Sequence, residues 1–291
     1  MKPAYLHHYV RFVAACTFVL LVAGGLVTST GSGLSVPDWP LSYGGLFPPM
    51  VGGIRFEHTH RVIAGFVGIL MLILAILTWR VETRRWARFV VLGALLMVLL
   101  QAVLGGLTVI YLLPDPVSVS HACLAQTFFC LVLSLTYFTS LEWKSGARFD
   151  SIGAAALKRL LILTSALVYL QLIAGAVVRH TQGAHGLALH ITLAVAIPLH
   201  ALFVVRKISC EDALSVKFSS HALCIGALAM LQVFLGLGSF YFTQMLKRPD
   251  DVPAGLGEVL FRTAHQTNGA LILSLCVLLT LRCHRLLRRA S

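Results

Sequence analysis

Four histidines recur at equivalent places along this chain, each one following an apolar segment that ends in small residues. The four copies join Gly24-Gly25 to His60, Gly105-Gly106 to His121, Gly175 to His190, and Gly236 to His265. An ionisable side chain inside a membrane is costly and is usually retained for function. Four equivalent imidazoles therefore predict two axial pairs, which is the ligand set for two bis-histidine haems.

Other ligands fit the histidine pattern less well. Zinc would favour closer spacing or cysteine ligands, whereas each histidine here belongs to its own long apolar segment. Facing histidines in a helical bundle are a usual way to hold haem. The glycine clusters are also explained by close helix packing, which is compatible with clearance for a flat macrocycle. We predict haem iron ligation by His60, His121, His190 and His265, each in the first turn of a helix.

Three charged residues near these histidines are further candidates. Glu57 precedes His60 by three residues, so one helical turn places both side chains on one face. An acid there could move protons or stabilise a developing cation, or it could simply be a carboxylate at a helix N-terminus. Haem propionates need cations, and Arg61 and Arg262 stand near the matching ends of their segments. Flanking charge that only sets topology is the alternative for both arginines.

The composition indicates a membrane protein. The chain of 291 residues is 58% hydrophobic and 12% charged, whereas soluble domains carry about 25% charge. Charge-free windows of about the length that crosses a bilayer cover roughly 12–30, 62–79, 89–112, 117–141, 160–178, 187–205, 218–243 and 263–281. The sequence therefore predicts an all-α polytopic membrane protein with eight transmembrane helices, arranged as two pseudo-equivalent four-helix bundles.

The net charge of +12 is distributed as in a membrane protein rather than a nucleic-acid-binding one. In the eight-span arrangement 17 of the 23 Lys and Arg residues fall on one side and 6 on the other. The positive-inside rule then places both termini in the cytoplasm. Met1-Lys2-Pro3 leads almost directly into the first span, which suggests a bacterial inner-membrane protein. None of the seven cysteines falls in an outer loop of this arrangement, so we expect no extracytoplasmic disulfide.

The predicted helices form a parallel repeat of two halves. Residues 1–141 make the first half, residues 142–159 a charged cytoplasmic linker, and residues 160–291 the second half. Two outer loops, at about 31–57 and 244–261, are long, and long ordered loops are often functional lids.

Several motifs resemble those of the haem A synthase family, over nearly the whole length. They are Thr30-Gly31-Ser32-Gly33-Leu34-Ser35 followed by Pro37-Asp38-Trp39-Pro40-Leu41 and Gly44, Glu57-His58-Thr59-His60-Arg61, Leu104-Gly105-Gly106-Leu107-Thr108 with His121, and Arg262-Thr263-Ala264-His265-Gln266. The combination of the Pro-Asp-Trp-Pro segment with Glu-x-x-His makes the resemblance specific, which a glycine cluster alone would not. Many bacterial members carry a cysteine pair in the first outer loop, where this chain has Val36 and Ser42.

The resemblance implies oxidation of the C8 methyl group of haem O to the formyl group of haem A, for cytochrome oxidase. It implies that His60 and His121 face haem O, that His190 and His265 ligate haem b, and that Glu57 is the essential acid. It also implies haem O synthase (protohaem farnesyltransferase) as a partner, beside membrane lipid. Nucleic acid is not an expected partner, and a homo-oligomer is left open.

Two other classes of function compete with this interpretation. A di-haem b-type electron-transfer cytochrome would use the same histidines but would need neither Glu57 nor the large first outer loop. A transporter built on parallel repeats would normally show broken helices with charges inside the membrane, and the predicted spans are nearly free of charge. Identification of the haems and of the product separates the three classes.

Overall fold

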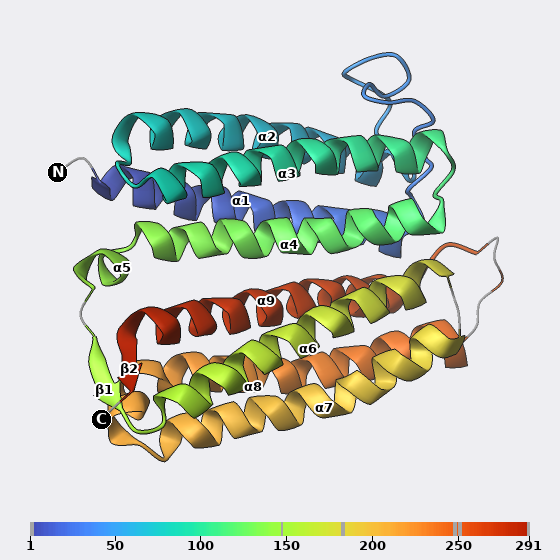
Figure 1. The fold of residues 1–291 in the computed structure, drawn as a ribbon. Coiled ribbons are helices and arrows are strands. Elements are labelled where there is room, and N and C mark those ends of the chain that lie inside the picture. Colours follow the sequence, from blue (N-terminus) through green and yellow to red (C-terminus); the bar gives the residue numbers. More distant parts are fainter. Residues whose placement is uncertain (1–2, 147, 182–183, 247–248, 250–251, 290–291) are drawn as a thin grey trace. The chain divides into compact units, whose positions relative to one another are not determined.

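Eight long helices dominate the structure, a computed structural model that describes residues 3–146, 148–181, 184–246, 249 and 252–289. Within these residues the helices long and apolar enough to cross a membrane are α1 (Pro3–Ser29), α2 (Ile54–Val81), α3 (Arg85–Ile110), α4 (Asp115–Thr139), α6 (Ala154–Thr181), α7 (Ala184–Ser209), α8 (Asp212–Phe240) and α9 (Leu256–Leu286) (Figure 1). The eight predicted spans are confirmed, and the chain is a multi-pass membrane protein.

The helices begin earlier than the apolar windows predicted. A hydropathy window stops at the first charge, whereas helical hydrogen bonding continues through Glu57 and Arg61 in α2 and starts at Asp115 in α4. The prediction that each histidine lies in a first helical turn is therefore wrong. His60, His121 and His190 are each the seventh residue of their helix, and His265 is the tenth of α9, so all four lie in the second or third turn.

Short elements lie at the ends of the predicted spans or beyond them. They are α5 (Leu141–Ser145), β1 (Phe149–Ser151), the π-helical turn η1 (Tyr241–Met245) that continues α8, and β2 (Leu287–Arg289). β1 and β2 pair in parallel, with Phe149 opposite Leu287. Among the described residues this pair of three-residue strands is the only sheet, so the all-α class stands.

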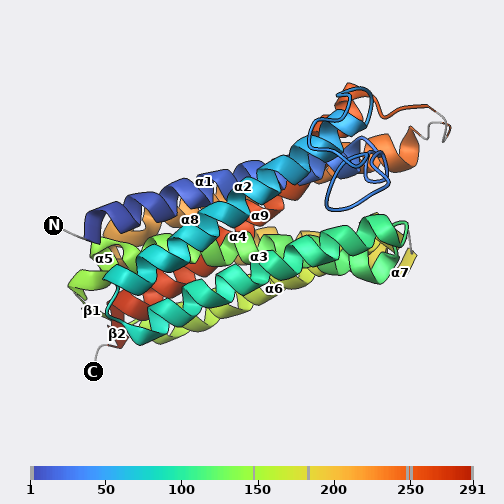
Figure 2. The same cartoon turned by 90° about the horizontal axis from the view of Figure 1, so that it is seen from above.

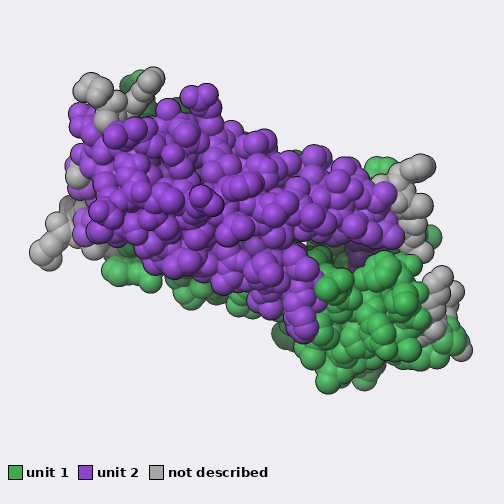
Figure 3. Space-filling model, turned by 90° about the horizontal axis from the view of Figure 1, so that it is seen from below, with its two compact units in different colours: residues 1–135, 235–267 green, residues 136–234, 268–291 purple. Residues whose placement is uncertain are grey.

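The helices pack into two compact units, coloured separately in Figure 3. Unit 1 contains Met1–Leu135 and Leu235–Thr267, and unit 2 contains Thr136–Phe234 and Asn268–Ser291. α8 and α9 each contribute residues to both units, so His265 belongs to unit 1 and His190 to unit 2. These are packing units. The predicted division into ligand-binding halves at 1–141 and 160–291 stays a prediction.

In unit 1, α1 packs along α2 and α2 packs along α3 (Figures 1 and 2). Val67, Met71 and Leu74 recur every three or four residues along α2 and are fully buried, as expected for the packed face of a helix. The Tyr9 hydroxyl of α1 donates a hydrogen bond to the Leu70 carbonyl oxygen at 3.0 Å. This packing fixes the helix that carries Glu57 and His60.

In unit 2, α6 packs along α7, and the predicted linker 142–159 is tied to the end of α9 (Figure 1). The Arg282 guanidinium donates to both carboxylate oxygens of Glu142, each at 2.8 Å. These hydrogen bonds hold the pKa of the Glu142 carboxyl below its ordinary value. Lys158 Nζ donates to the Leu287 carbonyl oxygen at 3.0 Å. The linker is therefore an ordered part of unit 2.

Candidate functional site

Each of the four histidine rings rests against the first glycine of its own repeat copy. A β-carbon built on that glycine would lie 3.0 to 3.1 Å from the Cε1 atom of the ring. The four pairs are Gly24 with His60, Gly105 with His121, Gly175 with His190, and Gly236 with His265. At this distance a methyl group would displace the imidazole, so each ring needs a glycine at this position. We call each of these four glycines the seat of its histidine ring. The sequence suggested clearance for a macrocycle, whereas the structure shows that the first glycine gives clearance to the histidine itself.

The backbone of the preceding helix orients at least one of these rings. His190 Nδ1 lies 3.3 Å from the Gln171 carbonyl oxygen. A carbonyl oxygen can only accept a hydrogen bond, so Nδ1 carries the proton and Nε2 carries the lone pair. The backbone of Leu20, the equivalent position in the first copy, lies beside the His60 ring. A histidine held through one nitrogen in this way presents the other to a metal.

The four histidines are compatible with axial ligation of haem iron. Within the part of the chain that the structure describes, no three His, Cys, Asp or Glu side chains converge into a metal site. In unit 1, His60 and His121 lie close enough to interact electrostatically. Paired imidazoles on separate helices, each cradled by a glycine, match the axial ligation of a haem.

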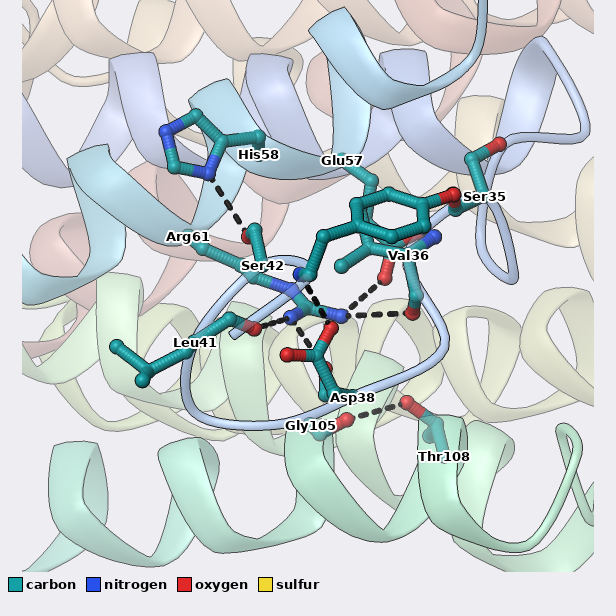
Figure 4. Close-up of polar contacts among 11 residues, drawn as sticks. Ser35, Val36, Asp38, Leu41, Ser42, Glu57, His58, Arg61, Gly105 and Thr108 are labelled. Carbon is teal, nitrogen blue, oxygen red and sulfur yellow. Dashed lines mark hydrogen bonds and ion pairs between the residues drawn. The ribbon is translucent and has the colours of Figure 1, made fainter. Parts of the chain in front are cut away.

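Glu57 is buried at the start of α2, with only 4% of its surface exposed. Both carboxylate oxygens have partners: Arg61 Nη2 donates to Oε1 at 2.5 Å, and the Val36 backbone N–H donates to Oε2 at 2.8 Å (Figure 4). The N-cap position of α2 is Gly53, which makes no side-chain cap. Glu57 therefore holds the loop before α2 and fixes its own carboxylate one helical turn from His60.

Arg61 hydrogen-bonds both to the loop before α2 and to Glu57. Its Nη1 donates to the Asp38 and Leu41 carbonyl oxygens, both at 2.6 Å, and its Nη2 donates to the Val36 carbonyl oxygen at 3.2 Å (Figure 4). With the bond to Glu57, four donor hydrogens of the guanidinium are used inside the protein. A propionate at Arg61 would compete with these acceptors, so Arg61 primarily closes the loop over α2.

The loop segment Val36–Tyr43 is also held by its own side chains. The Asp38 carboxylate accepts from the backbone N–H groups of Tyr43 and Gly44, both at 2.7 Å, and these bonds lower the pKa of Asp38. Tyr43 and Gly44 both have positive φ, so the aspartate caps a tight turn. Ser42 Oγ lies 2.9 Å from His58 Nδ1. Val36 and Ser42, where the resemblance would place a cysteine pair, thus both contact α2.

Trp39 connects the loop to α3. A β-carbon on Gly106 would lie 2.7 Å from Trp39 Cδ2, so only glycine admits the indole there. The neighbouring Gly105 is the seat of His121. The loop therefore contacts α2 beside His60 and α3 beside the seat of His121, all within unit 1.

A carboxylate–arginine pair with the same spacing as Glu57–Arg61 stands at the start of α9. Arg262 Nη1 donates to Glu258 Oε1, and the Arg262 Nε is buried without a hydrogen-bond partner among the described residues. Glu258 is a residue that the sequence reasoning missed. Its spacing to Arg262 is the same i, i+4 spacing as that of Glu57 and Arg61, which was the available signal.

Comparisons with known proteins agree with the resemblance to haem A synthases that the motifs indicated. Similar proteins include Heme A synthase of Shouchella clausii, 30% identical over 169 residues, which are 56% of each chain. Heme A synthase of Bacillus pumilus is 32% identical over 169 residues, 56% of this chain and 55% of that protein. Heme A synthase of Bacillus licheniformis is 32% identical over 170 residues, with the same coverage of 56% and 55%. The chain thus spans about half the length of the curated relatives it matches.

The sequence profile of the COX15-CtaA family, described as cytochrome oxidase assembly protein, matches residues 7–52 and 54–189. The match includes the loop before α2, Glu57, His60 and His121, and it ends one residue before His190. Because the matched residues make up more than half of the chain, the chain belongs to the COX15-CtaA family of cytochrome oxidase assembly proteins.

Proposed function

We propose that this protein is a haem A synthase, an oxidoreductase that converts the C8 methyl group of haem O to a formyl group. The observation that carries the proposal is the environment of Glu57. A buried carboxylate with both oxygens held stands one turn from a histidine seated on glycine, under a loop fastened to the same helix. The match to the COX15-CtaA family covers this part of the chain, and proteins similar to the chain are named Heme A synthase.

The histidines divide into two pairs in this proposal. His60 and His121 hold the substrate, haem O, and their proximity within unit 1 supports that pairing. His190 and His265 hold haem b, and this pairing rests on their equivalent places in the repeat. When bound, haem b supplies one-electron redox chemistry that side chains lack. The contacts of the rings with the glycines and the bond from His190 Nδ1, which leaves the lone pair on Nε2, support the proposed role of the histidines as ligands.

Glu57 acts on the methyl carbon through its charge and its proton affinity. Two successive hydroxylations of that carbon give a gem-diol, which loses water to leave the formyl group. With water as the attacking oxygen, each hydroxylation replaces a C–H bond with a C–O bond and releases two protons and two electrons, and bound haem b would supply the redox chemistry that carries the electrons away. A carboxylate fixed at this position stabilises positive charge that develops on the carbon, or accepts a proton from attacking water at a carboxylate oxygen. Arg61 and the Val36 N–H hold the carboxylate in one orientation, so it does not have to reorganise during the reaction.

Arg262 is the stronger candidate for a propionate contact. Its buried Nε has no partner among the described residues, and a carboxylate is the natural acceptor for a guanidinium. Arg61 is the weaker candidate for a propionate contact, since its terminal nitrogens already bind loop carbonyl oxygens and Glu57.

We also propose a location and a partner for this protein. The charge distribution favours cytoplasmic termini, which places the histidine-bearing ends of the helices toward the outer face of the bacterial inner membrane. Haem O synthase, which produces the substrate, is the proposed partner. Cysteine labelling of Asp38→Cys from outside intact cells, with Ser145→Cys as the protected control, tests this orientation.

The decisive experiment identifies the haems. The protein is produced in cells that make haem O, purified, extracted, and analysed by mass spectrometry. We expect haem b in the protein and haem A in the cells, with haem O or a hydroxylated intermediate accumulating when Glu57→Gln replaces the wild type. Bound haem b without any conversion of haem O by the wild type would instead favour the electron-transfer cytochrome.

A further inference from the structure

The first long loop changes character after Tyr43. Its earlier part, Val36–Tyr43, is held to α2 by Arg61, Glu57 and the Ser42–His58 bond. Residues 39–54 contain no charged side chain at all. The later part, Leu46–Val51, projects apolar side chains: Phe47 is 96% exposed, Leu46 67% and Val51 62%. We call Leu46–Val51 the apolar tip. A contiguous exposed apolar surface of this kind marks a contact with a protein or a membrane.

An open groove separates the apolar tip from α2. Phe47, Pro48 and Met50 line one side, and His58, Val62 and Ile63 line the other. The groove has a volume of about 400 Å³. His58 is the ionisable group in this lining, and its Nδ1 is engaged by Ser42 Oγ. The surface therefore suits hydrocarbon and offers little to a polar ligand.

The groove continues into an exposed apolar stripe along α2. Val62, Phe66, Ile69, Ile73 and Ile76 recur at spacings of three and four residues, and all five are exposed. Such a stripe on a membrane-spanning helix faces lipid acyl chains. Val62 belongs to both surfaces, so the groove opens directly onto the lipid-facing side of α2.

The length of α2 places the groove at the boundary of the hydrocarbon. α2 has 28 residues and is about 42 Å long at about 1.5 Å per residue. A hydrocarbon core of about 30 Å then leaves about 6 Å, or about four residues, outside it at each end. The hydrocarbon would therefore begin near residue 58, level with the groove.

We propose that the apolar tip inserts into the bilayer leaflet at this end of α2, and that a lipid acyl chain fills the groove. The absence of charge, the exposed side chains and the continuity with the lipid-facing stripe all favour lipid over a protein partner. Insertion anchors the far end of a loop whose near end is held over Glu57 by Arg61. The membrane surface then helps to keep that loop closed.

Photo-crosslinking tests this surface directly in native membranes. p-Benzoylphenylalanine is introduced at Phe47, at Leu46 in a second variant, and at exposed Asp115 at the start of α4 as the matched control. After irradiation of intact cells, the purified chains are analysed for adduct mass. We expect lipid adducts at positions 47 and 46 at least several-fold more abundant than at position 115.

Three results would overturn the proposal. One is a protein adduct at position 47, whether a second copy of this chain or another protein. Another is a lipid yield at positions 47 and 46 no higher than at 115. The third is loss of folded protein in both test variants, because it would mean that these side chains are packed inside the protein. None of these readouts depends on haem chemistry, so the test is independent of the proposed activity.

Discussion

Within unit 1, helices α2 and α9 each begin with a glutamate–arginine ion pair at i, i+4 spacing. The two pairs differ in their distance along the sequence from the histidine of the same helix. In α2 the pair Glu57–Arg61 occupies the positions three before and one after His60. In α9 the pair Glu258–Arg262 occupies the positions seven and three before His265. A shift of one helical turn thus places a carboxylate beside one histidine and a guanidinium beside the other.

The shift places side chains of opposite charge one helical turn before the two histidines, each within an ion pair. One turn before His60 stands a carboxylate, which can stabilise a developing cation or accept a proton. One turn before His265 stands a guanidinium, which suits an anion such as a propionate. The α2 pair is also covered by a loop that Arg61 fastens, while Arg262 retains a buried Nε without a partner among the described residues. We therefore expect the oxidation to take place at His60, and the residues beside His265 to hold a ligand.

The largest effect is expected from Glu57→Gln. The substitution keeps the shape of the side chain and removes its charge, so haem A formation should fall by about 100-fold or more while haem b stays bound. Haem extraction from cells making haem O measures both. Glu258→Gln is the matched control, from the same kind of i, i+4 pair, and should leave conversion largely intact. Equal losses in the two variants would remove the functional distinction between the pairs.

Substitution of the glycines that contact the histidine rings should affect the two haem sites independently. In Gly24→Ala and Gly175→Ala the new methyl group meets the ring of His60 or His190 at 3.0 Å, a local overpacking of about 1–3 kcal/mol. We expect Gly24→Ala to lower haem A formation about tenfold with haem b retained, and Gly175→Ala to lower haem b content.

Gly65→Ala and Gly68→Ala on α2 are the controls for the seats, because nothing lies within 4 Å of a β-carbon at either glycine. Both should leave haem content and conversion unchanged. If Gly24→Ala behaved like these controls, the seat would have no part in placing His60.

A smaller effect is expected from Arg262→Gln. Removing the guanidinium takes away its charge-assisted bond to a propionate, worth about 1.5–3 kcal/mol, so haem b should transfer faster to a haem acceptor such as apomyoglobin. Arg61→Gln should instead increase protease cleavage in residues 36–45, because three loop carbonyl oxygens lose their donor. Faster haem b loss from the Arg61 variant than from the Arg262 variant would reverse our assignment.

The sequence predicted the parts of this molecule that depend on side-chain type and spacing. Hydropathy located the eight spans, and repetition located the histidines together with the glycines on which they rest. It placed the helix starts too late, because helical hydrogen bonding passes through charged residues that end an apolar window. The placement of the rings in first turns was wrong for that reason.

Other features depend on the backbone and leave little trace in the sequence. Arg61 binds three carbonyl oxygens, and any residue type can supply a carbonyl. The pairing of β1 with β2 joins segments more than 130 residues apart and rests on backbone groups as well. The seat of Trp39 on Gly106 becomes clear only when the loop and α3 are seen together.

The smallest effect is expected from Glu142→Gln. Glu142 pairs with Arg282 in unit 2, and none of the four repeated histidines lies within one helical turn of either residue in the sequence. Loss of the bonds from Arg282 should cost about 1 kcal/mol of the free energy of unfolding and lower the Tm by a few degrees, with haem content and conversion unchanged. The pKa of Glu142 is lowered in the folded protein, so the pair stabilises the fold above the ordinary carboxyl pKa of about 4.3. That stabilisation is lost as the pH falls through the lower, folded-state value. The Tm difference between wild type and variant should therefore shrink on acidification below about pH 4.3. A change in haem content instead would show that a carboxylate–arginine pair affects the haem sites wherever it lies, and the distinction drawn between α2 and α9 would fail.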